Sequence, residues 1–332
     1  MDLLIVSDAW HPQVNGVVRS LDRLGQELCE KGLEISYLTP QSFRTLPCPT
    51  YPEIRLSLTL GHKVRRMIEE AQPTCLHIAT EGPLGFWARR YCLDRKLPFS
   101  TSYHTRFPEY VAARWPIPTE WTYSLLRWFH NAGHCCMVAT PSLHRDLEER
   151  GFENLSYWSR GVDLDLFKPE RANGSLTGDN PRYLYVGRVA IEKNIEAFLS
   201  LDLPGTKIVV GDGPQKAKLE QSFPDVQFLG MKEGEELAEI YASSDVFVFP
   251  SKTDTFGIVL LEAMASGLPV AAYPVMGPKD VIGDAPVGVL DDDLGKAIEG
   301  ALKLDRDACR AYAAEFSWTA SAEQFRQNML PM

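Results

Sequence analysis

Two carboxylates, Asp254 and Glu262, flank the predicted start of a helix in the second half of the chain. A short apolar segment before them predicts a buried strand, and Asp254 or Thr255 is expected to cap the helix that follows. The backbone N–H groups at Phe256 and Gly257 would lie at the positive end of that helix, where an anion is favoured. Glu262 comes about two turns later, on roughly the same face. The spacing predicts a diphosphate on the helix N-terminus with acids beside it that hold hydroxyl groups; the alternative is a capped core helix with one stray acid.

Two cations and a glycine turn follow other predicted strands of this half. Arg188 and Lys193 would lie at the mouth of a parallel sheet, where basic side chains can bind phosphate oxygens, although both could be ordinary solvated charges. The turn at Gly211 and Gly213 is typical of a nucleotide site but lacks the complete Gly-x-Gly-x-x-Gly spacing of a dinucleotide fingerprint. A further strand ends at 228–231, where main-chain groups could pair with the edge of a base or form a plain strand end. Together, the two cations, the glycine turn and this strand end predict a local phosphate and nucleotide site.

The first half offers a glycine and a histidine. Gly16 opens an amphipathic helix pattern. A glycine at this position lets a phosphate or sugar approach the backbone closely. The alternative is a glycine that is needed only for the geometry of the turn. His104 follows a buried strand and can hydrogen-bond a substrate hydroxyl or stabilise developing charge. The alternative is a histidine satisfied by its own loop. The sequence has no Gly-x-Ser-x-Gly elbow and no His-Glu-x-x-His pair, so hydrolase and zinc chemistry find no support.

Strands alternate with helical patterns in both halves, which predicts two doubly wound α/β domains with parallel sheets. We expect strands at 3–7, 34–39, 75–79, 99–103 and 137–140 in the first half, and at 183–186, 207–210, 226–229, 246–249, 270–272 and 287–290 in the second. A polar, turn-rich stretch, 168–181, is the predicted linker. Ligands of such sheets bind at the carboxyl ends of the strands, which is where the candidate residues fall.

Composition limits the classes of partner. With 34 basic and 44 acidic residues the net charge is -10, which argues against general nucleic-acid binding. Apolar runs are far shorter than the ~20 residues that cross a bilayer. The apolar start lacks the basic residues and cleavage site of a signal peptide, so we expect a first buried strand and a cytoplasmic chain. Seven cysteines without a Cys-x-x-Cys pair are expected to be reduced packing residues: Cys29, Cys48, Cys75, Cys92, Cys135, Cys136 and Cys309.

Aromatic and basic residues alternate through 106–131, with a basic run nearby at 63–66. Such a mixture is typical of a membrane interface or of a site for an amphipathic acceptor. Aromatic residues at helical spacing can equally form a core stripe. The residues concerned are Arg106, Phe107, Tyr110, Arg114, Trp115, Trp121, Tyr123, Arg127, Trp128 and Phe129.

Taken together, the motifs resemble those of the retaining GT-B glycosyltransferases of family 4 (GT4), over almost the whole chain. They occur in the order and approximate spacing of that family: Asn15-Gly16-Val17, Tyr103-His104-Thr105, Arg160-Gly161-Val162-Asp163, Gly187-Arg188 with Lys193, Gly211-Asp212-Gly213-Pro214, and Asp254-x-Phe256-Gly257 followed by Glu262. The resemblance implies two Rossmann-like domains that face a cleft. We expect an acceptor-binding domain at 1–165, a nucleotide-sugar-binding domain at 166–310, and a C-terminal helix at 311–332 that packs back on the first domain.

The resemblance also implies residue roles. Arg188 and Lys193 would bind the donor diphosphate, Glu262 the ribose, and Asp254 the transferred sugar, with His104 beside it. The catalytic set would be His104, Asp254, Arg188 and Lys193. The expected donor-binding set is Gly16, Gly187, Arg188, Lys193, Gly211, Gly213, Leu229, Met231, Asp254, Thr255, Phe256, Gly257, Ile258 and Glu262. Acceptor contacts are expected at Trp10, His11, Tyr103 and Arg106.

The expected activity is transfer of a hexose from a nucleotide-diphosphate sugar, GDP-mannose or UDP-glucose, to a hydroxyl of a lipid, for example of diacylglycerol type, or of a glycan. The resemblance implies retention of anomeric configuration, no metal and no cofactor. Many members carry glutamate where this chain has Asp254, which bears on the sugar that is taken. We expect a cytoplasmic enzyme with a peripheral contact at the inner face of the membrane. The alternatives are a non-catalytic nucleotide-sugar-binding module and a related GT-B epimerase.

Overall fold

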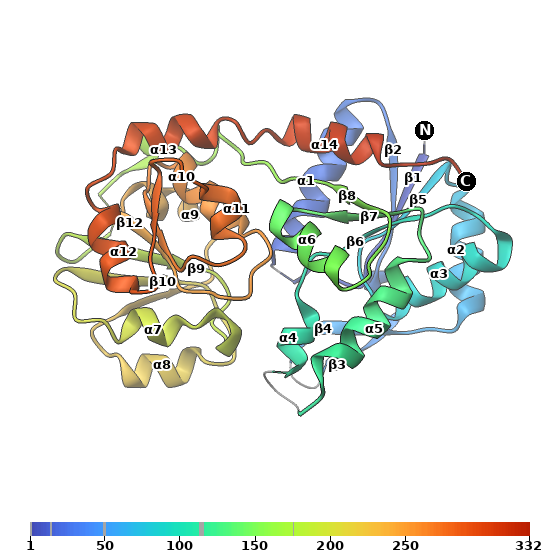
Figure 1. Cartoon of the computed structure of the whole chain (residues 1–332), viewed down its shortest axis with the longest axis horizontal. Helices are drawn as coiled ribbons and strands as arrows, with labels where there is room; N and C mark the ends of the chain where they lie inside the picture. Colours follow the sequence, from blue (N-terminus) through green and yellow to red (C-terminus); the bar gives the residue numbers. More distant parts are fainter. Residues whose placement is uncertain (1, 14, 49–50, 113–115, 175) are drawn as a thin grey trace. The chain divides into compact units, whose positions relative to one another are not determined.

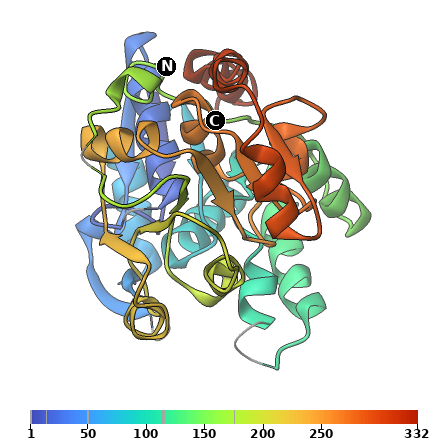
Figure 2. The ribbon, with the colours of Figure 1, turned by 90° about the vertical axis from the view of Figure 1, so that its left-hand side faces the viewer.

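The computed structural model describes residues 2–13, 15–48, 51–112, 116–174 and 176–332, without the side chains of 48 and 51–54. Of the aromatic and basic stretch, Arg114 and Trp115 lie outside the described residues. The chain forms two compact units. One contains Met1–Arg160 together with Trp318–Met332, and the other contains Gly161–Ser317. Each unit is built on its own six-stranded parallel sheet, with helices on both sides of the strands (Figures 1 and 2).

The first unit has the strand order β2-β1-β5-β6-β7-β8, and every pairing in this sheet is parallel. Its strands are β1 (Asp2–Val6), β2 (Glu34–Leu38), β5 (Cys75–Ile78), β6 (Ser100–Ser102), β7 (Cys135–Val138) and β8 (Leu155–Tyr157). An antiparallel hairpin, β3 (Arg44–Cys48) and β4 (Tyr51–Leu58), stands apart from the sheet. The helices are α1 (Gly16–Glu30), α2 (Gly61–Ala71), α3 (Pro83–Arg95), α4 (Phe107–Ala112), α5 (Thr119–His130), α6 (Pro141–Glu149) and α14 (Trp318–Gln327), with a 3-10 turn, η1 (Pro40–Ser42).

The second unit has the order β11-β10-β9-β12-β13-β14, again all parallel. Its strands are β9 (Arg182–Val186), β10 (Thr206–Val210), β11 (Gln227–Gly230), β12 (Val246–Phe249), β13 (Val270–Ala272) and β14 (Gly288–Leu290). The helices are α7 (Ile195–Leu199), α8 (Lys216–Ser222), α9 (Gly234–Ala242), α10 (Ile258–Ala265), α11 (Pro278–Ile282), α12 (Leu294–Ala301) and α13 (Arg306–Ala313), with 3-10 turns η2 (Pro169–Arg171) and η3 (Ile191–Lys193).

The prediction of two parallel α/β units is confirmed, and the predicted strands agree with the observed ones to within two residues at their ends. Three strands were not predicted. β8 has only three residues, Leu-Ser-Tyr, and is only partly buried, so it is too short to show an apolar run or a sustained alternation. β3 and β4 each contain a proline, Pro47 and Pro52, a residue that argues against a strand in sequence patterns.

The stretch 168–181, predicted as the linker, lies within the second unit, and the chain passes between units after Arg160 instead. Residues 161–167, which precede the predicted linker, already belong to the second unit. Arg310 on α13 donates to the carbonyl oxygens of Phe167 at 2.5 Å and Leu164 at 2.8 Å, and Val162 N–H donates to Phe316 O at 3.1 Å. Turn-forming composition marks surface loops as well as linkers, so it could not locate the passage between units.

The last helix, α14, completes the first unit by packing against α1 (Figure 1). Trp158 Nε1 donates to Ser321 Oγ at 3.1 Å, and Ser159 N–H donates to Gln324 Oε1 at 2.9 Å. Phe325 is fully buried, with its ring edge-on to His77 and to Trp158 at centroid distances of 4.8 Å and 4.9 Å. The core of the first unit therefore uses residues from both ends of the chain.

Phe325→Ala is expected to lower the free energy of unfolding of the first unit by about 3–5 kcal/mol, because it leaves a cavity between His77 and Trp158. Urea denaturation followed by tryptophan fluorescence measures the change. The control is Leu330→Ala, since Leu330 is 49% exposed and its loss should cost about 0.5 kcal/mol or less. Equal effects of the two substitutions would contradict this account of α14.

Candidate active site

The loops that follow β9, β10 and β12 meet at the carboxyl end of the second sheet. Gly187 N–H donates to Val210 O at 3.0 Å, and Val189 N–H donates to Asp212 O at 2.9 Å. These backbone bonds join the loop after β9 to the loop after β10. Two further bonds, from Asn194 Nδ2 to Pro250 O at 3.1 Å and from Thr253 Oγ1 to Glu192 O at 3.2 Å, join it to the loop after β12.

Glycine is required where two of these loops touch. Gly211 has φ +135°, and a Cβ there would lie 1.9 Å from Gly187 O. Gly213 has φ +158°, and its Cβ would lie 2.4 Å from Val189 O. Both positions combine a backbone conformation that favours glycine with a contact that leaves no room for a side chain. The turn that sequence spacing associated with a nucleotide thus has a defined structural function, which is close contact between loops.

Lys193 and Asp254 form an ion pair in this site. The distance from Nζ to Oδ1 is 2.5 Å, and the two side chains are 19% and 18% exposed. The other carboxylate oxygen, Oδ2, is buried and has no hydrogen-bond partner among the described residues. A buried acceptor without a donor is costly, so a donor from a ligand would be bound favourably there. Arg188 lies half-buried in the same loop as Lys193.

The predicted caps of the next helix are wrong. α10 begins at Ile258, and its N-cap is Gly257 with φ +84° and no side-chain hydrogen bond. Neither Asp254 nor Thr255 is its N-cap residue. Asp254 is held by Lys193, and Thr255 and Phe256 are buried in the loop before the helix. Because the N-cap residue is a glycine and supplies no side-chain acceptor, the backbone N–H groups at this N-terminus can serve an anionic ligand.

Glu262 lies one helical turn beyond that start and is buried, with 4% of its surface exposed. Tyr241, at the end of α9, is fully buried and donates from its hydroxyl to Glu262 Oε2 at 3.0 Å. Sequence reasoning missed Tyr241. The available signal was a tyrosine close to Leu237, Ala238 and Ile240 in the sequence, because a phenol that is buried with such residues needs a polar partner.

Two further donor candidates of the second unit, Leu229 and Met231, lie beside these loops. Gly211 N–H donates to Gly230 O at 2.8 Å, which places the end of β11, with Leu229 half-buried and Met231 exposed, next to the glycine turn. Gly16, in the first unit, opens α1 behind the cap Asn15, and a Cβ added to it would meet no atom within 4 Å. No steric contact within the described residues therefore requires glycine at position 16.

His104 follows β6 in the first unit. Arg160 donates from Nη2 to its Nδ1 at 3.1 Å, so the neutral imidazole carries its proton on Nε2. Loss of solvent, and then the charge of Arg160, hold the pKa of His104 well below its usual range. Arg160 is itself buried. Its guanidinium stacks on Trp158 at 3.8 Å and donates to Trp158 O at 2.6 Å, and burial lowers its pKa to about 9. The side chain of Arg160 was not predicted to act on His104.

The four predicted acceptor residues have different environments. Trp10 and Tyr103 are buried, and Trp10 packs on Tyr37 with ring centroids 4.5 Å apart. The His11 side chain is 50% exposed, with Nε2 3.8 Å from Asp22 Oδ2. Arg106 Nη2 lies 2.7 Å from Glu109 Oε1. The structure thus assigns local surroundings to these residues, and their contacts with an acceptor stay a prediction.

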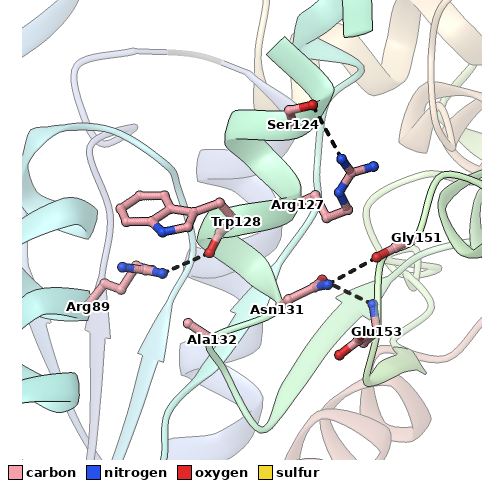
Figure 3. Close-up of a pocket in the computed structure, with 8 residues that line it drawn as sticks. All are labelled: Arg89, Ser124, Arg127, Trp128, Asn131, Ala132, Gly151 and Glu153. Atoms are coloured by element: carbon pink, nitrogen blue, oxygen red, sulfur yellow. Dashed lines mark hydrogen bonds between the residues drawn. The ribbon is translucent and has the colours of Figure 1, made fainter. Parts of the chain in front are cut away.

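A surface hollow of about 670 Å³ on the first unit is lined by residues of α3, of α5 and of the loops after α5 and α6 (Figure 3). It contains none of the predicted donor or acceptor residues, but Arg127 and Trp128 of the aromatic and basic stretch line it. Among the described residues, His, Cys, Asp and Glu side chains form no group of three or more that could hold a metal ion. The six described cysteines are free, and five of them are buried.

Two family models match the chain almost end to end. Residues 14–166 match the model described as Glycosyltransferase Family 4, and residues 167–315 match Glycosyl transferases group 1. The chain belongs to glycosyltransferase family 4. The predicted family is thereby confirmed.

Relatives of this family 4 chain support the assignment. It is 32% identical over 310 residues to the sulfoquinovosyl transferase SQD2 of Arabidopsis thaliana, a match that covers 84% of this chain and 60% of that protein. It is 29% identical to a GDP-mannose-dependent alpha-mannosyltransferase of Mycobacterium tuberculosis, covering 86% and 82%. It is 26% identical to the alpha-monoglucosyldiacylglycerol synthase of Streptococcus pneumoniae, covering 98% and 83%.

The fold is likewise that of the family. Sucrose-phosphate synthase from Thermosynechococcus elongatus superposes with a TM-score of 0.78 over 98% of this chain and 97% of that one, at 23% identity. The expected GT-B architecture is confirmed.

Gly211→Ala is expected to destabilise the second unit by about 3 kcal/mol or more, because the new methyl group meets Gly187 O and the backbone is strained. The matched control is Gly234→Ala. Gly234 also has positive φ, +55°, but no atom lies within 4 Å of its Cβ position, so a cost of about 1 kcal/mol is expected. Chemical denaturation of both variants gives the comparison, and equal costs would show that the loops can separate.

Proposed function

We propose that the chain transfers a hexose from a nucleotide-diphosphate sugar to a hydroxyl of a lipid or glycan, with retention and without a metal ion. The observation that carries this proposal is the half-buried ion pair of Lys193 and Asp254, in which Asp254 Oδ2 has no hydrogen-bond partner among the described residues. Asp254 lies in the loop that leads into α10, whose N-cap residue is a glycine. The names of the relatives support GDP-mannose as the donor in one case and a diacylglycerol lipid as the acceptor in another. UDP-glucose is the other candidate donor.

In this proposal each group has a separate task in donor binding. Lys193 and Arg188 neutralise the diphosphate together with the backbone N–H groups at the start of α10. Asp254 Oδ2 accepts a hydrogen bond from a hydroxyl of the transferred sugar. Glu262, held by Tyr241, accepts hydrogen bonds from the ribose hydroxyls. Because these groups already supply positive charge and helix-end N–H groups, the leaving diphosphate needs no metal ion.

The reaction would proceed on one face of the sugar. The bond between the anomeric carbon and the phosphate oxygen breaks, the acceptor oxygen forms a bond to the same carbon, and the departing phosphate oxygen takes the acceptor proton. His104, neutral and with a proton on Nε2, donates a hydrogen bond to a hydroxyl of the sugar ring. Its low pKa keeps it in that form throughout the neutral range, because a histidine with lowered pKa binds no second proton there.

Lys193→Ala and Glu262→Ala are both expected to lower kcat/KM by about 100-fold or more, because each removes a group that binds charge or hydroxyls of the donor. Lys232→Ala is the matched control, since Lys232 also pairs with an acid, Glu236, but lies just before α9 and is not one of the predicted donor residues. Rates are measured with labelled GDP-mannose and UDP-glucose, and folding by circular dichroism. Near-normal turnover in either variant would contradict the assignment of the donor site.

The main alternative is a binding module without catalysis. It requires that the wild-type protein binds a nucleotide sugar in calorimetry, yet neither hydrolyses it nor transfers it to any acceptor of a panel. The comparisons favour an enzyme, because the relatives named above are transferases and a synthase.

We further propose that the chain meets its lipid acceptor at a membrane surface through α5. Among the described residues, no helix is long and apolar enough to span a bilayer. On α5, Trp121, Leu125 and Trp128 are exposed by 72%, 49% and 52%. These three residues, the apolar stripe of α5, follow helical spacing on the face opposite Tyr123, Leu126 and Phe129, which are buried. The aromatic stretch thus divides into a core face and an exposed face, and the exposed one suits an interfacial position.

The double substitution Trp121→Ser with Leu125→Ser is expected to reduce binding to phosphatidylglycerol and phosphatidylcholine vesicles by about tenfold or more, because two apolar side chains lose their burial in lipid. Co-sedimentation measures the bound fraction. Leu302→Ser is the control, because Leu302 is an exposed apolar residue of the second unit. Donor hydrolysis should be unchanged in both variants. A wild-type protein that stays in the supernatant would contradict the membrane proposal.

A further inference from the structure

A carboxylate that sequence reasoning did not select lies at the carboxyl end of the first sheet. Glu81 follows β5 and precedes α3, in a loop at the edge where ligands of parallel α/β sheets bind. Its side chain is 26% exposed. The next strand, β6, ends at Ser102, so Tyr103 and His104 occupy the neighbouring position on the same edge.

A buried histidine, His130, holds the Glu81 carboxylate in place. His130, the last residue of α5, is fully buried and places Nε2 2.9 Å from Glu81 Oε1. Its Nδ1 lies 2.9 Å from Thr101 Oγ1, and that hydroxyl donates to Cys135 O at 3.4 Å. Since the threonine proton is used on the carbonyl, Nδ1 is the donor to Thr101. Both ring nitrogens therefore donate, which is the pattern of an imidazolium.

The charge state of His130 agrees with this hydrogen-bond pattern. Burial alone would lower its pKa, but the Cys136 thiol and the Glu81 carboxylate raise it to about 10. A protonated ring donates to the Glu81 carboxylate and fixes the direction of that carboxylate. A buried ion pair of this kind adds little to stability compared with an apolar pair of the same size. The pair is therefore better explained by what the carboxylate does at the edge of the sheet.

We propose that Glu81 is an acceptor-binding residue, whose carboxylate accepts a hydrogen bond from a hydroxyl of a polyhydroxy acceptor such as a sugar or polyol head group. The inference rests on the proposed transferase function. His130 and Thr101 are positioning residues, because they act only through Glu81. The bound hydroxyl is a neighbour of the reacting one, since the leaving phosphate takes the reacting proton and a carboxylate paired with an imidazolium is a weak base.

Glu81→Gln tests the proposal with octyl glucoside and dioctanoylglycerol as acceptors. Glutamine keeps the shape but loses the charge, and a hydrogen bond to a charged group is stronger than one to a neutral group. We expect KM for octyl glucoside to rise about tenfold, while kcat, KM for the donor and donor hydrolysis change by less than about threefold. Dioctanoylglycerol offers a single hydroxyl, so its KM should stay within the same threefold limit.

Two variants separate binding from structure. Glu81→Asp keeps the charge but shortens the side chain, so it should raise KM for octyl glucoside less than Glu81→Gln does. Thr101→Val removes the hydroxyl oxygen that accepts from His130 Nδ1. It should raise KM for octyl glucoside, although the Glu81 side chain itself is unchanged. A variant series that lowers the melting temperature and kcat but leaves KM for octyl glucoside unchanged overturns the proposal and makes the pair structural.

The outcome also distinguishes this inference from the proposed function. A wild-type protein that neither hydrolyses nor transfers any donor sugar removes the transferase proposal and, with it, this one. A wild-type protein that hydrolyses donor but transfers to neither acceptor, or a Glu81→Gln variant with unchanged KM, removes the acceptor role of Glu81 alone.

Discussion

The ion pair between Lys193 and Asp254 is the contact on which the proposed donor site depends. It joins the loop after β9 to the loop after β12, two strands that are neighbours in the sheet. A pair that is mostly removed from solvent gains little net stability, because desolvation offsets much of the attraction. The pair instead fixes the positions of the two side chains. Each charge holds the other at the mouth of the sheet, and a ligand that offers a phosphate to one and a hydroxyl to the other can bind without separating them.

At the sheet edges of both units, a cation holds a polar group in place. In each, a cation with restricted access to solvent fixes a polar group that the sheet presents: Lys193 with Asp254, Arg160 with His104, and His130 with Glu81. Only the second of these pairs lacks a negative charge. Its effect is to keep an imidazole neutral, because two cations side by side are unfavourable. In the other two pairs the cation holds a carboxylate in place at the edge of its sheet.

Much of this arrangement could be predicted from the sequence, because it depends on strand ends. Apolar runs located the strands of both sheets, and residues after a strand such as Arg188 and His104 then had to lie at the edge. What the sequence could not show was which side chains meet. Asp254 was expected to cap a helix, since capping is a local pattern, but its partner lies 61 residues away. Tyr241 and Glu81 were missed for the same reason, because each is recognised only by a contact made through the fold. The passage between units was misplaced because turn residues mark any exposed loop.

The return of the chain to the first unit sets an order of events during synthesis. Every residue of the second unit is contiguous, from 161 to 317, so this unit can fold as soon as its own segment has left the ribosome. The first unit is synthesised first but lacks Phe325, Ser321 and Gln324 until residues 318–332 have emerged. Its core around Trp158 and His77 stays open while the whole second unit is made. The half of the protein that is translated first is therefore the half that is completed last.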